Sequence, residues 1–213
     1  MTAGTPSPFR PTVTLWVLLG AFGFLLASLV VGALRRPVPA AADVTAPTPA
    51  SVGDSLVGPA VYTVDATDEF QWTFFDFSRN AVVAAPGPLD WDLAFRRFII
   101  IANGGTGFAG QGGVVDLGVP FDSVREAPDT GYAPTARDST NPGIGHWYKY
   151  GYSSHLLDPG GHTYVVRTAD GHYAKFSIVG YYCREVRSGC FTIRYAYQGD
   201  GTRTLTRVPS PRR

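Results

Sequence analysis

The apolar residues of this chain follow two different patterns. Between Pro11 and Leu34 they form one run, TVTLWVLLGAFGFLLASLVVGAL, that contains no charged residue. From position 61 onward they occur in short runs rich in β-branched and aromatic residues, divided by clusters of Gly, Pro and Asp. The first pattern predicts one long apolar helix, and the second predicts a domain of short β-strands.

The apolar run is long enough to cross a membrane. About 22 helical residues at a rise of 1.5 Å cover about 33 Å, the thickness of a bilayer core. A cleavable signal peptide has a shorter apolar region, and the alanines at 40–42 lie beyond Arg35, Arg36 and two prolines. We therefore expect residues 1–36 to form a single transmembrane anchor. Its small residues spaced four apart, which permit close helix packing, are Gly23 with Ala27 and Ser28 with Gly32.

Residues 37–60 are rich in Pro, Ala, Ser and Thr and contain few large apolar side chains. Such a segment cannot bury enough surface to fold alone, so it predicts an extended tether. The β domain is expected over residues 61–207, and residues 208–213 form a C-terminal tail.

The β domain is predicted to be antiparallel. Asp170-Gly171 between two alternating runs is a strong hairpin signal. In the second of these runs, alternation predicts that Ala174, Phe176 and Ile178 face the core. The Pro/Gly-rich stretch 119–145 predicts an ordered excursion or a partner-binding loop. The expected strands cover 61–66, 70–78, 80–85, 91–102, 113–118, 146–152, 163–169, 172–182, 190–198 and 203–207.

Composition narrows the functional classes. Only 16% of the residues are charged and the net charge is +1, which argues against a nucleic-acid binder held by a basic field. Two cysteines cannot form a structural zinc site on their own. They flank a six-residue turn between two strand-like runs, where Cys183 and Cys190 can form a disulfide across the ladder. The alternative is two reduced, buried thiols.

A disulfide would indicate an oxidising compartment. Basic residues stand on both sides of the anchor, Arg10 before it and Arg35-Arg36 after it, so charge alone gives almost no orientation. The expected location is therefore the bacterial inner membrane, single-pass, with the C-terminal domain in the periplasm.

Candidate catalytic motifs all have simpler interpretations. The sequence from Gly105 to Gly110 matches GxGxxG but leads into another strand rather than a helix, which favours a glycine-rich loop. Asp90 and Asp92 lie on one strand face, where solvated carboxylates beside Arg96 and Arg97 are favoured over an acid/base pair. The sequence contains no plausible catalytic triad, so we expect a protein that is not an enzyme.

Four histidines are the only plausible nitrogen ligands for haem or zinc: His146, His155, His162 and His172. None forms an HxH or HxxxH pair, and His162 and His172 would lie too far apart on one hairpin to share a metal. His146 and His155 flank an aromatic run and are the candidate haem ligands, although each is also typical of a surface histidine.

Several segments in one order resemble the HmuY family of bacterial haem-binding proteins. They are DWDLAFRR at 90–97, the glycine cluster from Asn103, YVVRTADGHYAKFSIVGYY at 164–182 and TIRYAYQ at 192–198. The resemblance covers about residues 60–207. It implies an all-β domain and, in the family's haem carriers, haem held by side chains. Those carriers are typically lipid-anchored through an N-terminal cysteine, which this chain lacks near its start.

Three hypotheses follow. The first is an accessory subunit of a bacterial membrane complex, such as a respiratory or photosynthetic electron-transfer assembly, that carries no cofactor. Its partners would be other subunits, contacted by helix, tether and β domain, and the lipid bilayer. The second is a membrane-anchored haem-binding protein. The third is an enzyme, which no motif supports.

Overall fold

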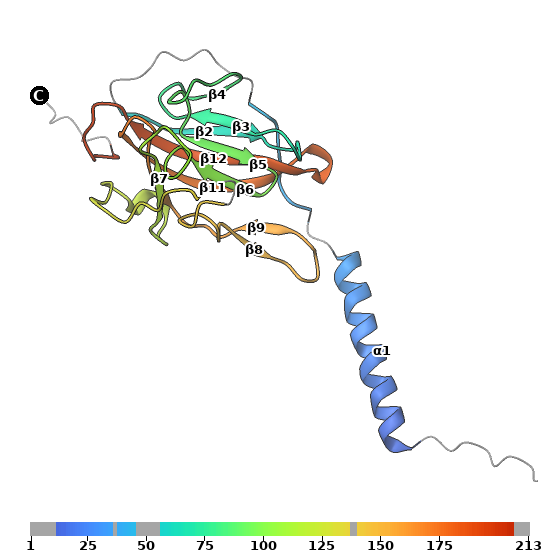
Figure 1. Cartoon of the computed structure of the whole chain (residues 1–213). Coiled ribbons are helices and arrows are strands. Elements are labelled where there is room, and N and C mark those ends of the chain that lie inside the picture. Colours follow the sequence, from blue (N-terminus) through green and yellow to red (C-terminus); the bar gives the residue numbers. More distant parts are fainter. Residues whose placement is uncertain (1–11, 36–37, 46–55, 137–139, 207–213) are drawn as a thin grey trace, which may run out of the picture. The chain divides into compact units, whose positions relative to one another are not determined.

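The computed structural model describes residues 12–35, 38–45, 56–136 and 140–206. The N-terminal part is the helix α1 (Val13–Leu34), and the remainder forms a β domain (Figure 1). Arg35 closes the helix by donating its backbone N–H to the carbonyl of Val31 at 3.0 Å. No residue of α1 is buried, and its side chains are apolar all round. By length and composition, α1 is the helix in the described part of the chain that could cross a membrane.

The described residues of the β domain form two main sheets and one short hairpin. The larger sheet has the order β2-β12-β11-β10-β7, and β1 pairs with β11. Its strands are β1 (Ala41–Ala42), β2 (Val57–Asp65), β7 (Gly113–Asp116), β10 (Tyr164–Arg167), β11 (Tyr173–Cys183) and β12 (Ser188–Gln198). The smaller sheet has the order β4-β3-β5-β6 and the strands β3 (Thr73–Asp76), β4 (Ala81–Val83), β5 (Leu93–Arg96) and β6 (Ile99–Ala102). The hairpin is β8 (Tyr148–Tyr150) with β9 (Leu157–Pro159).

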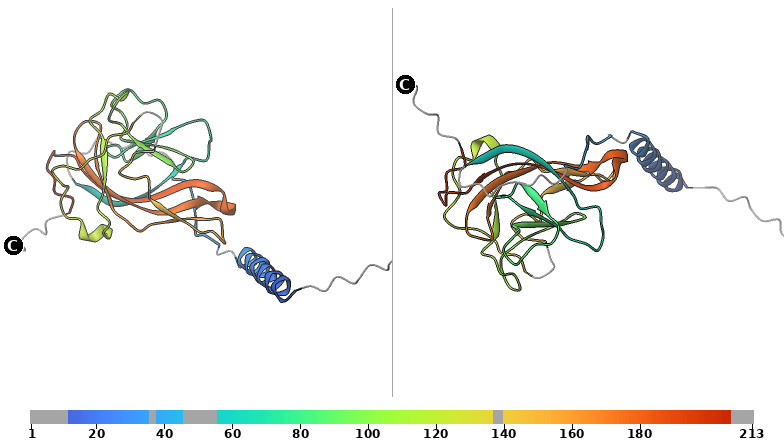
Figure 2. Two further views of the ribbon diagram at one scale, coloured as in Figure 1. Left: turned by 60° about the horizontal axis from the view of Figure 1, so that its bottom comes forward. Right: turned by 90° about the horizontal axis from the view of Figure 1, so that it is seen from above.

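The long hairpin β11–β12 runs through the length of the domain (Figure 2). Its register pairs Tyr173 with Gln198 at one end and Tyr182 with Ser188 at the other. The turn before β11 contains Gly171 at φ 93°, the left-handed conformation that an Asp-Gly hairpin turn requires. The antiparallel fold that the sequence predicts is therefore confirmed.

The core between the two sheets is mainly aromatic. Phe75 of the smaller sheet lies 5.7 Å, between ring centroids, from Tyr195 of β12. Phe95 lies 5.0 Å from Phe191 in the same way, and both side chains are fully buried. Large aromatic side chains bury the most apolar area per residue, so this layer supplies much of the stabilisation of the domain.

The second face of β11 is also buried. The short helix η1 (Phe121–Ser123) and the residues after it cover this face, and Lys175 is only 2% exposed. The Lys175 ammonium donates to the carbonyls of Phe121 at 3.1 Å and Val124 at 2.5 Å, and it lies 4.4 Å from the Phe121 ring centre. The excursion 119–145 is thus ordered where it is described, and its first part is fixed by a buried lysine.

The tether predicted over 37–60 needs correction. Ala41 and Ala42 form a parallel pair with Tyr182 and Cys183, and β2 already begins at Val57. β10 pairs with β11 only as far as Phe176. Ala41 and Ala42 pair with the edge of β11 further along, at Tyr182 and Cys183. Small alanines need no core for this, because main-chain hydrogen bonds alone add a strand. The compact β unit begins at Pro39, while residues 46–55 and the tail 208–213 lie outside the described residues.

Two strand predictions also differ from the structure. The run 91–102 forms two strands, because Arg97 adopts φ 53° and reverses the chain between β5 and β6. The run 203–207 forms no strand in its described part. It contributes one isolated bridge, between Thr204 and Glu126.

Candidate functional site

The turn between β11 and β12 is closed by a disulfide. Cys183 and Cys190 are bonded, with their Cα atoms 5.1 Å apart, and both are buried. Between them lies the short helix η2 (Arg184–Val186), in which Glu185 and Val186 have positive φ angles. A disulfide on such a turn fixes a conformation that side-chain-bearing residues rarely adopt. Together with an N-terminal apolar helix, the disulfide indicates an extracytoplasmic location for the β domain.

Removing this crosslink should weaken the domain measurably. For Cys183→Ser with Cys190→Ser we expect a loss of about 2–3 kcal/mol in the free energy of unfolding, from the entropy of the open loop in the unfolded chain. Denaturant unfolding of the full chain in detergent, with and without reductant, checks this. Equal midpoints for oxidised wild type and the double variant would contradict it.

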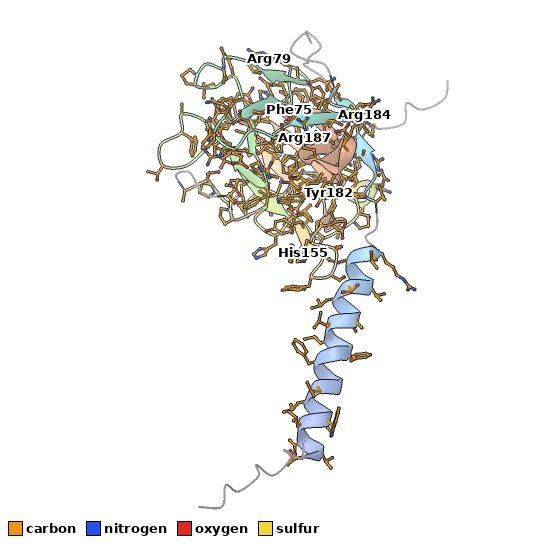
Figure 3. The ribbon with its side chains drawn as sticks, turned by 90° about the vertical axis from the view of Figure 1, so that its right-hand side faces the viewer. Phe75, Arg79, His155, Tyr182, Arg184 and Arg187 are labelled. Atoms are coloured by element: carbon orange, nitrogen blue, oxygen red, sulfur yellow. A yellow bond between two sulfur atoms is a disulfide. The ribbon has the colours of Figure 1, made fainter. Side chains whose placement is uncertain are left out.

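Tyr182 connects three parts of the domain beside this turn (Figure 3). Its backbone pairs with Ala41 of β1, and its hydroxyl accepts a hydrogen bond from the backbone N–H of Leu157 in β9 at 2.7 Å. Arg184 follows two residues later and pairs with Asp43 in the segment after β1, with Nη2 to Oδ2 at 2.8 Å. The end of β11 therefore holds both the incoming chain and the hairpin β8–β9.

The four histidines divide into two kinds. His162 and His172 each place Nδ1 close to a carboxylate, Asp116 at 2.8 Å and Asp170 at 2.9 Å. Both histidines are partly exposed. His162 is hydrogen-bonded to Asp116, and His172 lies at ion-pair distance from Asp170.

The two candidate haem ligands are on the surface. His146 is exposed and directly precedes the buried Trp147. His155 is exposed, lies in the loop between β8 and β9 and has φ 57°. The described residues contain no group of three or more His, Cys, Asp and Glu side chains that could hold a metal ion. A role for His146 and His155 stays a prediction.

Asp92 is a buried acceptor and not the solvated carboxylate that its sequence position favours. It is 5% exposed, and its two oxygens accept hydrogen bonds from the backbone N–H groups of Phe77 and Ala169, both at 2.9 Å. Phe77 follows β3 and Ala169 follows β10, so one carboxylate joins the two sheets. Burial, and next the nearby Asp76 carboxylate, raise the pKa of Asp92 to about 7.

Asp90 has a different environment. It pairs with Arg79, from Nη2 to Oδ1 at 3.0 Å, rather than with Arg96 or Arg97. Its pKa is lowered by the backbone N–H of Gly87 and by Arg79. A small polar pocket of about 160 Å³ lies here, lined by Asp76, Ser78, Arg79, Leu89, Asp90, Asp92 and Asp170. Two of these carboxylates, Asp76 and Asp92, are buried, and Asp90 is paired with Arg79, which indicates a structural joint between the sheets.

The glycine-rich segment is a tight loop. Gly105 and Gly107 have φ angles of 106° and 96°, and a Cβ atom on Gly104 would lie 1.9 Å from the carbonyl oxygen of Gly112. The strand β7 follows directly, so no helix begins here to bind a pyrophosphate. The loop interpretation of the GxGxxG match is confirmed.

Comparison with known proteins identifies the fold. No protein-family model and no curated protein matches this sequence. Among solved structures, the apo HmuY analogue of Tannerella forsythia aligns with a TM-score of 0.52 at 18% identity, over 68% of this chain and 99% of its own. A putative HmuY-like haem-binding protein of Bacteroides vulgatus gives 0.51 at 22% identity, covering 67% and 91%. Apo PinO from Porphyromonas gingivitis gives 0.52 at 13%, covering 65% and 96%. The β domain therefore has the HmuY-like fold that the sequence resemblance implied.

Proposed function

We propose that this chain is a membrane-anchored, extracytoplasmic and non-catalytic binding protein whose ligand is haem. The observation that carries the proposal is the fold, because the matched solved structures include one titled as a putative haem-binding protein. The apolar helix α1 supports the anchor, and the disulfide supports an oxidising compartment. In a Gram-negative cell this would be a single-pass inner-membrane protein with its β domain in the periplasm.

The exposed histidines of the chain are ligands of the kind that bind haem iron. Neutral imidazole nitrogens are common axial ligands of haem iron, and His146 and His155 are both exposed to solvent. An aromatic residue lies near the second of them, Tyr152, which is 85% exposed and could stack on a flat macrocycle. Haem bound here would supply its iron for storage or transfer. The chain's own residues would bind and orient it.

Haem binding can be assigned to these histidines by substitution. The full chain in mild detergent, titrated with haem, should give a sharp Soret band, and His146→Ala or His155→Ala should weaken affinity at least about tenfold by removing an axial ligand. His162→Ala is the matched control, because that imidazole already pairs with Asp116. Wild-type affinity in both ligand variants would exclude His146 and His155 as ligands.

A second candidate function is favoured by the surface of α1. Its apolar side chains are exposed all round, and a Cβ atom added at Gly20 or Gly23 would meet nothing within 4 Å. Such small residues let a second helix approach closely in a bilayer, as predicted for Gly23 with Ala27 and Ser28 with Gly32. The chain would then be an accessory subunit of a membrane complex, for which a respiratory or photosynthetic electron-transfer assembly is a suitable host.

A further inference from the structure

Three connections meet at one end of the β domain, the end where β12 begins. The loop after β2 starts at Ala66, which donates its backbone N–H to the carbonyl of Gly189 in the disulfide turn at 2.7 Å. The turn between β5 and β6 is held to the same place, because Arg97 donates to the carbonyl of Ala66 at 2.8 Å. The β2–β3, β5–β6 and β11–β12 connections are therefore neighbours.

The hairpin β8–β9 joins them through two further contacts. The indole nitrogen of Trp147, just before β8, donates to the carbonyl of Phe98 in the β5–β6 turn at 3.0 Å. Leu157, the first residue of β9, donates to the Tyr182 hydroxyl at the end of β11. We call the first three connections, residues 66–72, 97–98 and 184–187, together with Tyr150 at the end of β8, the tether-end loops.

The tether-end loops carry a concentration of exposed apolar side chains. Phe70 is 81% exposed, and Phe98, Tyr150 and Val186 are between 42% and 48% exposed. Isolated exposed apolar residues are normal on a protein surface, but several large ones on neighbouring loops mark an interaction surface. Phe70, Phe98 and Val186 belong to connections and Tyr150 ends the short hairpin strand β8, so packing of the two main sheets does not account for their character.

The covalent chain limits what this surface can meet. Leu34 ends α1, and Ala41 begins β1, so seven peptide links separate them and span at most about 25 Å. Ala41 pairs with Tyr182, the same residue that holds the hairpin β8–β9. If α1 crosses a membrane, as the proposed function requires, the tether-end loops are the part of the β domain kept within reach of the bilayer.

We propose that the tether-end loops rest on the bilayer surface, with Phe70, Tyr150 and their neighbours in the headgroup region. Tyrosine is favoured at this interface because its ring is apolar and its hydroxyl remains hydrated. The tether-end loops have no excess of positive charge, because they carry three basic residues, Arg97, Arg184 and Arg187, and three acidic ones, Asp68, Glu69 and Glu185. Arg184 also lies against Asp43, and Arg187 within 4.0 Å of Asp65. The surface therefore suits zwitterionic headgroups such as phosphatidylcholine and needs no anionic lipid.

Hydroxyl-radical footprinting of the full chain in phosphatidylcholine nanodiscs tests this proposal. In Phe70→Ser with Val186→Ser, we expect Tyr150 and Phe98 to be oxidised about threefold faster than in the wild type, because the apolar contacts with lipid are lost. The matched control is Leu89→Ser. Leu89 is 52% exposed and lines the pocket with Asp170, beyond the start of β11 and so at the opposite end of the domain. This control should oxidise like the wild type.

Each outcome has a separate meaning. Equal oxidation of Tyr150 and Phe98 in all three chains overturns the proposal. Protection that occurs in native membranes but not in pure-lipid nanodiscs also overturns it, and indicates a protein partner instead. A chain that does not co-elute with nanodiscs contradicts the anchor itself, which is the proposed function. Because the substituted side chains are exposed, an unchanged thermal midpoint is expected and shows that the variants are folded.

Discussion

Replacing Phe191 by alanine should cost about 3–5 kcal/mol of the free energy of unfolding, a large share of the stability of a single domain. Phe191 is fully buried on β12, and its ring lies 5.0 Å from the rings of Phe95, Trp147 and Tyr181. It thus connects the larger sheet to the smaller one and to the segment that leads into β8. Truncation to alanine leaves a cavity between β5, β11, β12 and the segment before β8, and these packed elements cannot easily close it.

Phe70→Ala is the matched control for this experiment. It removes the same atoms, but from a side chain that is 81% exposed, so a change within about 0.5 kcal/mol is expected. Denaturant unfolding of both full-chain variants in detergent, with intrinsic tryptophan fluorescence as readout, compares them. Equal midpoints for Phe191→Ala and Phe70→Ala would contradict the position of Phe191 at the centre of the core.

Asp92 should make the stability of the domain depend on pH near neutrality. Burial raises its pKa to about 7 in the folded state, whereas an unfolded aspartate titrates near 4. The folded state therefore binds the extra proton more tightly. This tighter proton binding stabilises the folded state. The stabilisation is fully present below about pH 4 and is lost as the pH rises to about 7. The free energy of unfolding should accordingly be lower at pH 8 than at pH 5.5.

The variant Asp92→Asn isolates this effect. The amide cannot ionise, whereas all other titratable groups are common to both chains. The difference in the free energy of unfolding between wild type and variant should therefore change between pH 5.5 and pH 8. The variant should also lose about 1–3 kcal/mol at pH 5.5, because an amide with one oxygen leaves either the Phe77 or the Ala169 N–H without an acceptor. A wild-type-to-variant difference that is constant with pH would contradict a raised pKa at Asp92.

The sequence predicted those parts of the fold that depend on local periodicity. The alternation through Phe176 and Ile178 gave the core face of β11, and the Asp170-Gly171 turn gave the hairpin. The apolar run 13–34 gave the helix. These signals lie within one element, where the period of the side chains and the turn chemistry decide the structure.

Features that depend on long-range packing were not predicted. Asp92 and Lys175 are buried by segments far away in the sequence, which supply their backbone partners. Ala41 and Ala42 join the sheet through main-chain bonds alone, which leave no mark in the side-chain pattern. One available signal was the position of Asp92 between Trp91 and Leu93 at the start of a long apolar run, where a solvated carboxylate is unusual.

Native size analysis of the full chain tests most directly whether it is an anchored, haem-binding protein. The chain would be extracted from membranes in mild detergent, supplied with haem and separated by size, with the absorption spectrum recorded across each peak. An anchored haem-binding protein should give a small peak, one chain in a detergent micelle, that carries a Soret band. A small peak that stays colourless would contradict haem binding, and co-migration with a large assembly without added Soret absorption would replace this account with that of an accessory subunit.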